Sequence, residues 1–213
     1  MTMTLTPEIL LSAYAGGIFP MAEHRDDPEL FWVDPRERGI IPLDGFHISR
    51  SLAKTIRSER FNISYDTDFS GVVRGCAERD ETWINDMLFD LYSQLHRNHD
   101  ARSIEVWEDG QLVGGLFGIT IGGAFFGESM FSRSRDASKV ALAYLVDRLN
   151  VGGFTLFDTQ FITPHLARLG ACQIPRATYR KQLKIALGQD ANFDRQGDVA
   201  ARDQLLQRSA QTS

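Results

Sequence analysis

The chain has 213 residues and a net charge of −5, with 43% apolar and 24% charged residues, which is ordinary for a globular protein. No apolar run approaches the length that spans a membrane, and the five histidines lack the spacing of a metal site. Because the net charge is negative, any contact with nucleic acid must come from a local basic patch. Cys76 and Cys172 are far apart in the sequence, which indicates a reduced, cytosolic chain.

The first 46 residues are expected to form a small, aromatic-rich α+β domain. Thr6 followed by Pro7 is typical of a helix start, and Gly16-Gly17 is typical of a helix end. Further Pro and Gly residues predict short segments joined by turns. Because this unit is too short to bury a large core, we expect it to pack on the remaining domain, residues 47–213.

The second domain is predicted to begin with a helix over 47–60 that carries a basic stripe. Ile48, Leu52 and Ile56 recur every four residues and indicate a buried face. Four cations fall roughly opposite: Arg50, Lys54, Arg57 and Arg60. Such a stripe is either a solvated face or a track for a phosphate backbone, and the pattern leaves both open.

The segment from residue 61 onward predicts a sheet with flanking helices. In order, the patterns indicate a strand at 61–65, helices after Asp68 and over 84–97, a hairpin turning at Asp109-Gly110, a strand through Glu128, a helix to Leu149, a strand at 154–161 and a short helix at 164–169. The polar tail, residues 188–213, is expected to be a loose helix or disordered. This order is similar to the acyltransferase fold of the GNAT superfamily. We therefore expect an α+β protein with a small N-terminal unit packed on a GNAT-like domain, which has a mixed central sheet and flanking helices.

One predicted strand places a single carboxylate among aromatic residues. Simple alternation puts Phe126, Glu128 and Met130 on one side, and Phe125, Ser129 and Phe131 on the other. A carboxylate among such neighbours is costly to desolvate unless it is paired or hydrogen-bonded. Glu128 is therefore either a salt-bridged residue at a strand end or part of a functional site.

A second predicted strand carries Asp158 and Gln160 on the same face. Asp158 can accept a hydrogen bond from the Gln160 amide, which would orient the amide carbonyl. The alternative is that this face lies at a solvent-exposed end of the sheet. In the GNAT-like order this strand neighbours the strand of Glu128 and splays away from it, so we expect the three polar groups to line one slot.

The loop between the Glu128 strand and the next helix bears on the acyl donor. Residues 132–139 contain no glycine, and Asp136 at the helix start would repel a pyrophosphate. Coenzyme A is therefore disfavoured as the donor.

Ten short motifs point to another donor. They are Tyr14 to Pro20, Trp32 to Arg36, His47 to Ser51, Thr82 to Ile84, Ser103 to Trp107, Leu112 to Gly115, Gly127 to Ser132, Ala137 to Lys139, Asp158 with Gln160, and Leu169 to Ala171. In this order and spacing they resemble the leucyl/phenylalanyl-tRNA–protein transferase family. The resemblance implies transfer of Leu or Phe, and less well Met, from aminoacyl-tRNA to the α-amino group of an N-terminal Arg or Lys. That transfer marks the acceptor protein for N-degron proteolysis.

The resemblance also assigns roles to the polar groups. Gln160, oriented by Asp158, would steer the attacking amine, and Glu128 would contact the cationic acceptor or the amino group of the donor. Because an aminoacyl ester is already activated, no cofactor and no metal are implied. The protein is expected to be a monomer that binds no membrane.

Further candidates would bind the donor. An apolar pocket for its side chain is expected from Leu116, Phe125, Met130, Leu142 and Leu145. Trp32 and Trp83 are candidates for stacking the terminal adenosine, and Arg50, Lys54 and Arg57 for contacting the tRNA backbone. Ordinary core packing is the alternative for each apolar residue, and for Leu142 and Leu145 it is the stronger one. Solvation is the alternative for the three cations.

Other functions stay open. An acetyl-CoA-dependent GNAT N-acetyltransferase is one, although the missing glycines argue against it. A cell-wall branching transferase uses the same donor but carries two such domains. A non-catalytic module that binds N-termini or tRNA ends belongs to a different class.

Overall fold

The computed structural model describes residues 5–27, 29–79 and 82–211. The helices in this part are α1 (Pro7–Ala15), α2 (Arg50–Arg57), α3 (Phe69–Ala77), α4 (Asp86–Arg97), α5 (Ala137–Gly152), α6 (Pro164–Ala167), α7 (Arg176–Leu187), the short 3-10 helix η1 (Phe193–Gln196) and α8 (Arg202–Gln211). The strands are β1 (Phe19–Met21), β2 (Phe31–Val33), β3 (Glu37–Ile40), β4 (Asn62–Tyr65), β5 (Ala101–Glu108), β6 (Gln111–Ile121), β7 (Ala124–Ser132), β8 (Leu156–Gln160) and β9 (Cys172–Pro175).

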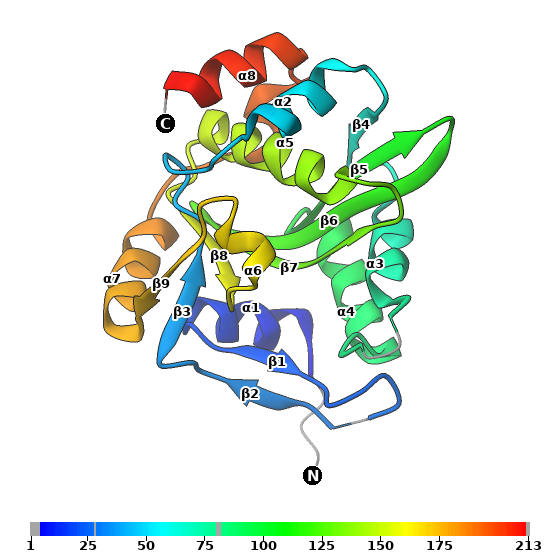
Figure 1. Cartoon of the computed structure of the whole chain (residues 1–213). Coiled ribbons are helices and arrows are strands. Elements are labelled where there is room, and N and C mark those ends of the chain that lie inside the picture. Colours follow the sequence, from blue (N-terminus) through cyan, green and yellow to red (C-terminus); the bar gives the residue numbers. More distant parts are fainter. Residues whose placement is uncertain (1–4, 28, 80–81, 212–213) are drawn as a thin grey trace.

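A seven-stranded sheet forms the centre of the molecule, in the order β4-β5-β6-β7-β8-β3-β9. β7 and β8 pair in parallel, and the other neighbours pair antiparallel, so the sheet is mixed. β1 and β2 form a separate two-stranded ribbon. The predicted α+β class, with a mixed central sheet and flanking helices, is confirmed (Figure 1).

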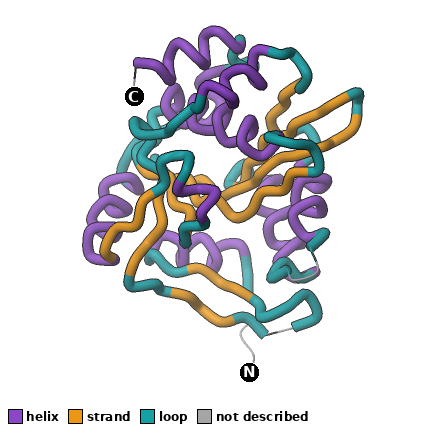
Figure 2. The backbone as a smooth tube through the Cα atoms, viewed as in Figure 1, coloured by secondary structure: helices purple, strands orange, loops and turns teal. Residues whose placement is uncertain are grey.

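Apolar side chains cover both faces of the sheet and form two cores. One core joins the sheet to α2, α5, α6 and α8, and the other joins it to α1, α3, α4 and α7. Figure 2 shows the strands passing between these two groups of helices. Helix α5 is buried along almost its whole length, because it contacts the sheet on one side and α2, η1 and α8 on another.

Two segments lie differently from the simplest expectation. β3 comes from the first 46 residues but occupies a place inside the large sheet, between β8 and β9, so it crosses the predicted domain boundary. The tail is attached to the body rather than disordered. Phe193 of η1 is 3% exposed and Leu205 of α8 is 1% exposed, and both belong to the core around α5. These apolar contacts, together with ion pairs such as Arg208–Asp147 and Arg102–Asp194, bind the tail to the body.

Candidate active site

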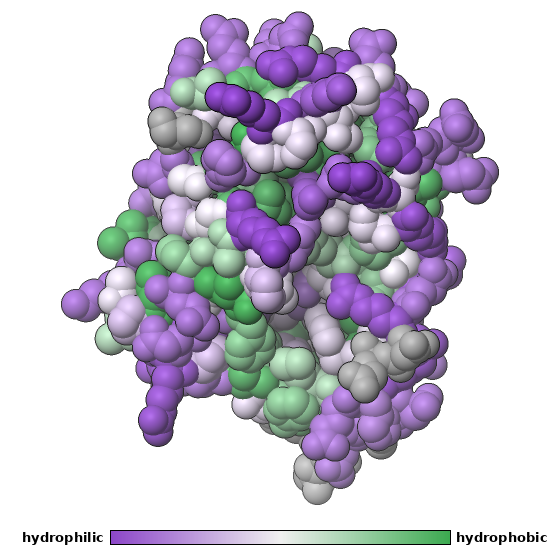
Figure 3. All heavy atoms as spheres, in the orientation of Figure 1, coloured by the Kyte–Doolittle hydropathy of each residue, from purple (hydrophilic) through white to green (hydrophobic). Residues whose placement is uncertain are grey.

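The strands β7 and β8 diverge at the middle of the sheet. Their parallel pairing covers only 124–126 of β7 and 156–158 of β8. Beyond this point the strands and neighbouring segments enclose a cavity of about 230 Å³, which Glu128 and Gln160 both line. On the face shown in Figure 3, apolar residues form a band from the centre toward the lower end, with polar residues on both sides. The expected slot between splayed strands is therefore present, but only two of the three predicted polar groups line it, because Asp158 is fully buried beside it.

Glu128 occupies a β-bulge. On β6, Phe117 pairs with Ser129 and Gly118 pairs with Gly127, so Glu128 has no residue opposite it. The extra residue reverses the alternation that follows. Phe126 and Phe131 therefore join one core, whereas Phe125 and Met130 contact the other, which corrects the predicted alternation of faces.

The Glu128 carboxylate lies against two buried tyrosines. Tyr92 Oη donates to Glu128 Oε2 at 2.9 Å, while Glu128 Oε1 is buried and has no hydrogen-bond partner among the described residues. Burial raises the pKa of Glu128 from 4.5 to about 7, and the Tyr14 and Tyr92 hydroxyls lower it only in part. Near neutral pH this carboxyl group can therefore take up or release a proton.

Asp158 is held in a network that the sequence did not predict. Its side chain is 0% exposed and pairs with Arg38, from Arg38 Nε to Oδ1 at 2.9 Å and from Nη2 to Oδ2 at 2.7 Å. Tyr179 Oη donates to Oδ2 at 2.6 Å. Arg38 also donates to the Gly17 carbonyl at 3.0 Å, and its guanidinium lies over the rings of Phe19 and Tyr179. The pair thus joins β3, β8, α7 and the end of α1.

Gln160 is oriented through its main chain, not through its side chain as expected. Its N–H donates to Asp158 Oδ1 at 2.8 Å, and its φ is +57°, in the left-handed region that glutamine rarely adopts. The side-chain Nε2 is buried without a hydrogen-bond partner in the described part of the chain. The Asp158 carboxylate therefore stabilises a strained turn that leaves the Gln160 amide free in the cavity.

The structure separates the other predicted site residues into two groups. Leu116, Met130, Leu142 and Trp83 line the cavity. Phe125 and Leu145 do not line it; each is 0% exposed and lies in the core around α5. Trp32 is 44% exposed on the β1–β2 ribbon.

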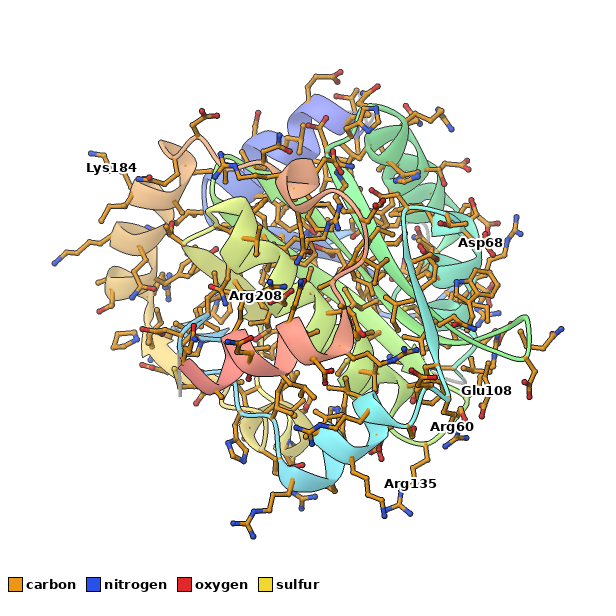
Figure 4. All side chains as sticks on the ribbon, turned by 90° about the horizontal axis from the view of Figure 1, so that it is seen from above. Arg60, Asp68, Glu108, Arg135, Lys184 and Arg208 are labelled. Atoms are coloured by element: carbon orange, nitrogen blue, oxygen red, sulfur yellow. The ribbon has the colours of Figure 1, made fainter. Side chains whose placement is uncertain are left out.

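The predicted basic stripe is shorter than expected. Arg50, Lys54 and Arg57 are exposed on α2, and no ion pair involves them among the described residues. Arg60 lies beyond the end of α2 and pairs with Glu108 (Figure 4). Only the first three cations remain available on this face.

Four buried residues that were not predicted for the site lie next to its two carboxylates. They are Tyr14, Arg38, Tyr92 and Tyr179. In the sequence Tyr14 and Tyr92 stand among apolar residues, a pattern that by itself indicates core packing. The available signal was chemical: a buried arginine or tyrosine needs a polar partner, so each indicates one nearby.

Glu128 and Gln160 line one largely apolar cavity between the splayed strands of a GNAT-like fold, so this cavity is the candidate site. FemX, a solved structure, shares this fold with a TM-score of 0.53 at 13% identity, over 78% of this chain and 66% of FemX. No helix in the described ranges is long and apolar enough to cross a bilayer.

Sequence comparison identifies the family. The profile "Leucyl/phenylalanyl-tRNA protein transferase" matches residues 40–184, and the profile of that family's N-terminal domain matches residues 3–36. A protein from Ruegeria sp. (strain TM1040), named leucyl/phenylalanyl-tRNA–protein transferase, is 62% identical over 99% of this chain and 100% of its own length. One of the same name from Cereibacter sphaeroides is 62% identical over 98% of both chains. The chain belongs to the leucyl/phenylalanyl-tRNA–protein transferase family.

The Asp158–Arg38 pair yields a stability prediction. Arg38→Met leaves a buried carboxylate without its counter-ion, so we expect a loss of about 3–5 kcal/mol in the free energy of unfolding, measured with urea. Asp158→Asn in the Arg38→Met background removes that buried charge, so the double variant should lose less than the sum of the two single losses. Strictly additive losses would show that the two side chains do not interact.

The raised pKa of Glu128 predicts a pH-dependent contribution to stability. The folded protein retains the Glu128 proton up to about pH 7, whereas the unfolded chain releases it near pH 4.5. The stabilisation is therefore complete below pH 4.5 and is lost as the pH rises through 7. Relative to Glu128→Gln, wild-type stability should fall by up to about 3 kcal/mol between pH 5 and pH 8. A difference that is independent of pH would contradict the burial argument.

Proposed function

We propose that this chain transfers Leu or Phe, and less well Met, from aminoacyl-tRNA to the α-amino group of an N-terminal Arg or Lys of an acceptor protein. Family membership supports the donor class. The observation that carries the proposal is a largely apolar cavity lined also by Glu128 and Gln160, each of which has a buried side-chain polar atom without a hydrogen-bond partner among the described residues. The transfer would occur in the cytoplasm on a monomer and mark the acceptor for N-degron proteolysis.

The reaction joins an amine to an activated ester. The acceptor nitrogen attacks the ester carbonyl, a C–N bond forms, and the ester C–O bond to the ribose breaks. An ammonium group must lose one proton before it attacks, and the ribose oxygen takes up a second proton as it leaves. No cofactor or metal is required, and positioning can lower the barrier by roughly 7–11 kcal/mol in favourable cases.

Glu128 is the carboxylate suited to receive the first proton. The oxygens of Asp158 already accept from Arg38, Tyr179 and the Gln160 N–H. Glu128 keeps one oxygen free and has a pKa of about 7, close to the pH at which the proton must move. We therefore assign proton acceptance and contact with the cationic amine to Glu128.

Gln160 positions the amine. The turn held by Asp158 fixes the main chain of Gln160, and its side-chain amide is left with unused hydrogen-bonding capacity in the cavity. An amide can accept from the attacking α-amine without taking its proton. Asp158 acts through Gln160 and is a positioning residue.

The apolar lining suits the donor side chain. Leu116, Met130 and Leu142 supply apolar lining, so selection among apolar side chains rests on size and shape. Such a pocket discriminates by only about 1–3 kcal/mol per methylene, which agrees with acceptance of Leu, Phe and Met. Trp83, beside the cavity, is the better placed candidate for the terminal adenosine, and Trp32 lies at the exposed ribbon. Arg50, Lys54 and Arg57 remain candidates for the tRNA backbone.

The proposal is tested by transfer of radiolabelled Leu or Phe from charged tRNA to a protein that begins with Arg. The label should appear on that acceptor and not on the same protein beginning with Asp or Glu. Equal labelling of both acceptors would contradict the Arg/Lys preference. Acetylation of the Arg-starting protein from acetyl-CoA, without transfer from tRNA, would favour the N-acetyltransferase alternative.

Two leucines of α5 provide a matched test of the pocket. Leu142 lines the cavity, whereas Leu145, one turn further along the same helix, does not. Leu142→Ala enlarges the pocket, so the ratio of kcat/KM for Phe over Leu should rise roughly 10-fold. Leu145→Ala should lower stability and leave this ratio unchanged. The pocket assignment is wrong if both variants alter the ratio equally.

A further inference from the structure

Three cations, separate from those of α2, lie in segments that also carry residues of the cavity lining or adjoin such segments. Lys139 precedes Leu142 by three residues on the same side of α5, and Leu142 lines the cavity. Arg168 follows Leu166, which also lines the cavity, directly after α6. Arg135 lies in the loop before α5 and is 90% exposed. We call Arg135, Lys139 and Arg168 the cationic rim.

The rim retains a net positive charge. Asp136 is the carboxylate paired with it: it bonds Lys139 at 2.7 Å and lies 3.8 Å from Arg135. Arg168 is exposed and takes part in no ion pair within the described ranges. Three cations and one carboxylate leave a net charge of +2 on a protein whose overall charge is −5. Local positive charge of this kind attracts an anion to one place on an acidic protein.

His165 lies close enough to Lys139 and Arg168 for their charges to change its pKa. It lies next to Leu166, and its Nε2 is buried without a hydrogen-bond partner in the described part of the molecule. Burial lowers the pKa of His165, and the nearby charges of Lys139 and Arg168 lower it further. The imidazole is thus neutral at pH 7, and the charge of the rim comes from the lysine and the arginines.

We propose that the cationic rim binds the phosphodiester groups next to the terminal nucleoside of the donor. This inference rests on the proposed function, because the donor ester must enter the cavity, and Lys139 and Arg168 lie within three residues of Leu142 and Leu166, which line it. The side chain of the donor occupies the apolar cavity, and the phosphates that follow its nucleoside pass Lys139 and Arg168 on the way out. The rim thereby adds a second surface for the donor, on α5 and directly after α6, to the candidate surface on α2.

The test compares two donors that differ in phosphate. One is full aminoacyl-tRNA, and the other is an aminoacyl ester of adenosine, which has no phosphate. For Lys139→Ala combined with Arg168→Ala, KM for aminoacyl-tRNA should rise about 10-fold, because two charge-assisted hydrogen bonds to phosphate are removed. The dependence of this KM on salt should weaken by about 0.7 in log–log slope for each single-stranded phosphate that the variant no longer binds. KM for the aminoacyl ester of adenosine, which has no phosphate, should not change.

The control is Lys184→Ala on α7, on the opposite side of the molecule from Arg135 (Figure 4). It removes an exposed cation and should leave KM for both donors unchanged. The inference is overturned if the double variant lowers transfer from both donors equally, which would mean that Lys139 and Arg168 act through folding. It is also overturned if the double variant leaves KM for both donors unchanged. Failure of the wild-type protein to use either donor would instead refute the proposed function.

Discussion

The buried pair of Arg38 and Asp158 is the interaction on which the candidate site depends. Arg38 is 1% exposed and Asp158 is 0% exposed, so each charge would be very costly to bury alone. Together with Tyr179 they satisfy one another and tie β3 and α7 to β8, between two aromatic rings. The same carboxylate then accepts from the Gln160 N–H and holds a left-handed turn at the end of the strand. A structural ion pair thereby sets the position of a functional amide.

Glu128, on the opposite wall of the site, lies in an environment that differs from that of Asp158. Glu128 has no counter-ion within hydrogen-bond reach among the described residues; it has one tyrosine hydroxyl and a free oxygen, in a bulge that removes it from regular pairing. Neighbouring strands therefore carry two carboxylates in different states. Asp158 is fully bonded and fixed, whereas Glu128 is desolvated, with a pKa of about 7. Two carboxyl groups in such different environments can take different roles, one in positioning and the other in proton transfer.

Much of this could be predicted from the sequence, because periodicity and turn residues reveal helices, strands and the hairpin. The polar residues in apolar strands also indicated which strands meet at the site. The remainder depends on long-range contacts. Arg38 and Asp158 are 120 residues apart, and Tyr179 lies on α7, a helix that no pattern had predicted. The bulge at Glu128 depends on register against β6, so simple alternation assigned the wrong face to Met130. Phe125 and Leu145 have the chemistry of pocket residues, and only the packing of α5 shows that they belong to the core.

In the proposed reaction, Asp158 acts by holding Gln160 in place, so that the Gln160 amide positions the attacking amine. The most direct test is the single-turnover rate of transfer, with saturating donor, for Gln160→Ala and Asp158→Asn beside the wild type. Both variants should be slowed, and the double variant should be little slower than Gln160→Ala, because the two residues act as one unit. Wild-type rates for both single variants, in protein that is still folded, would contradict the account.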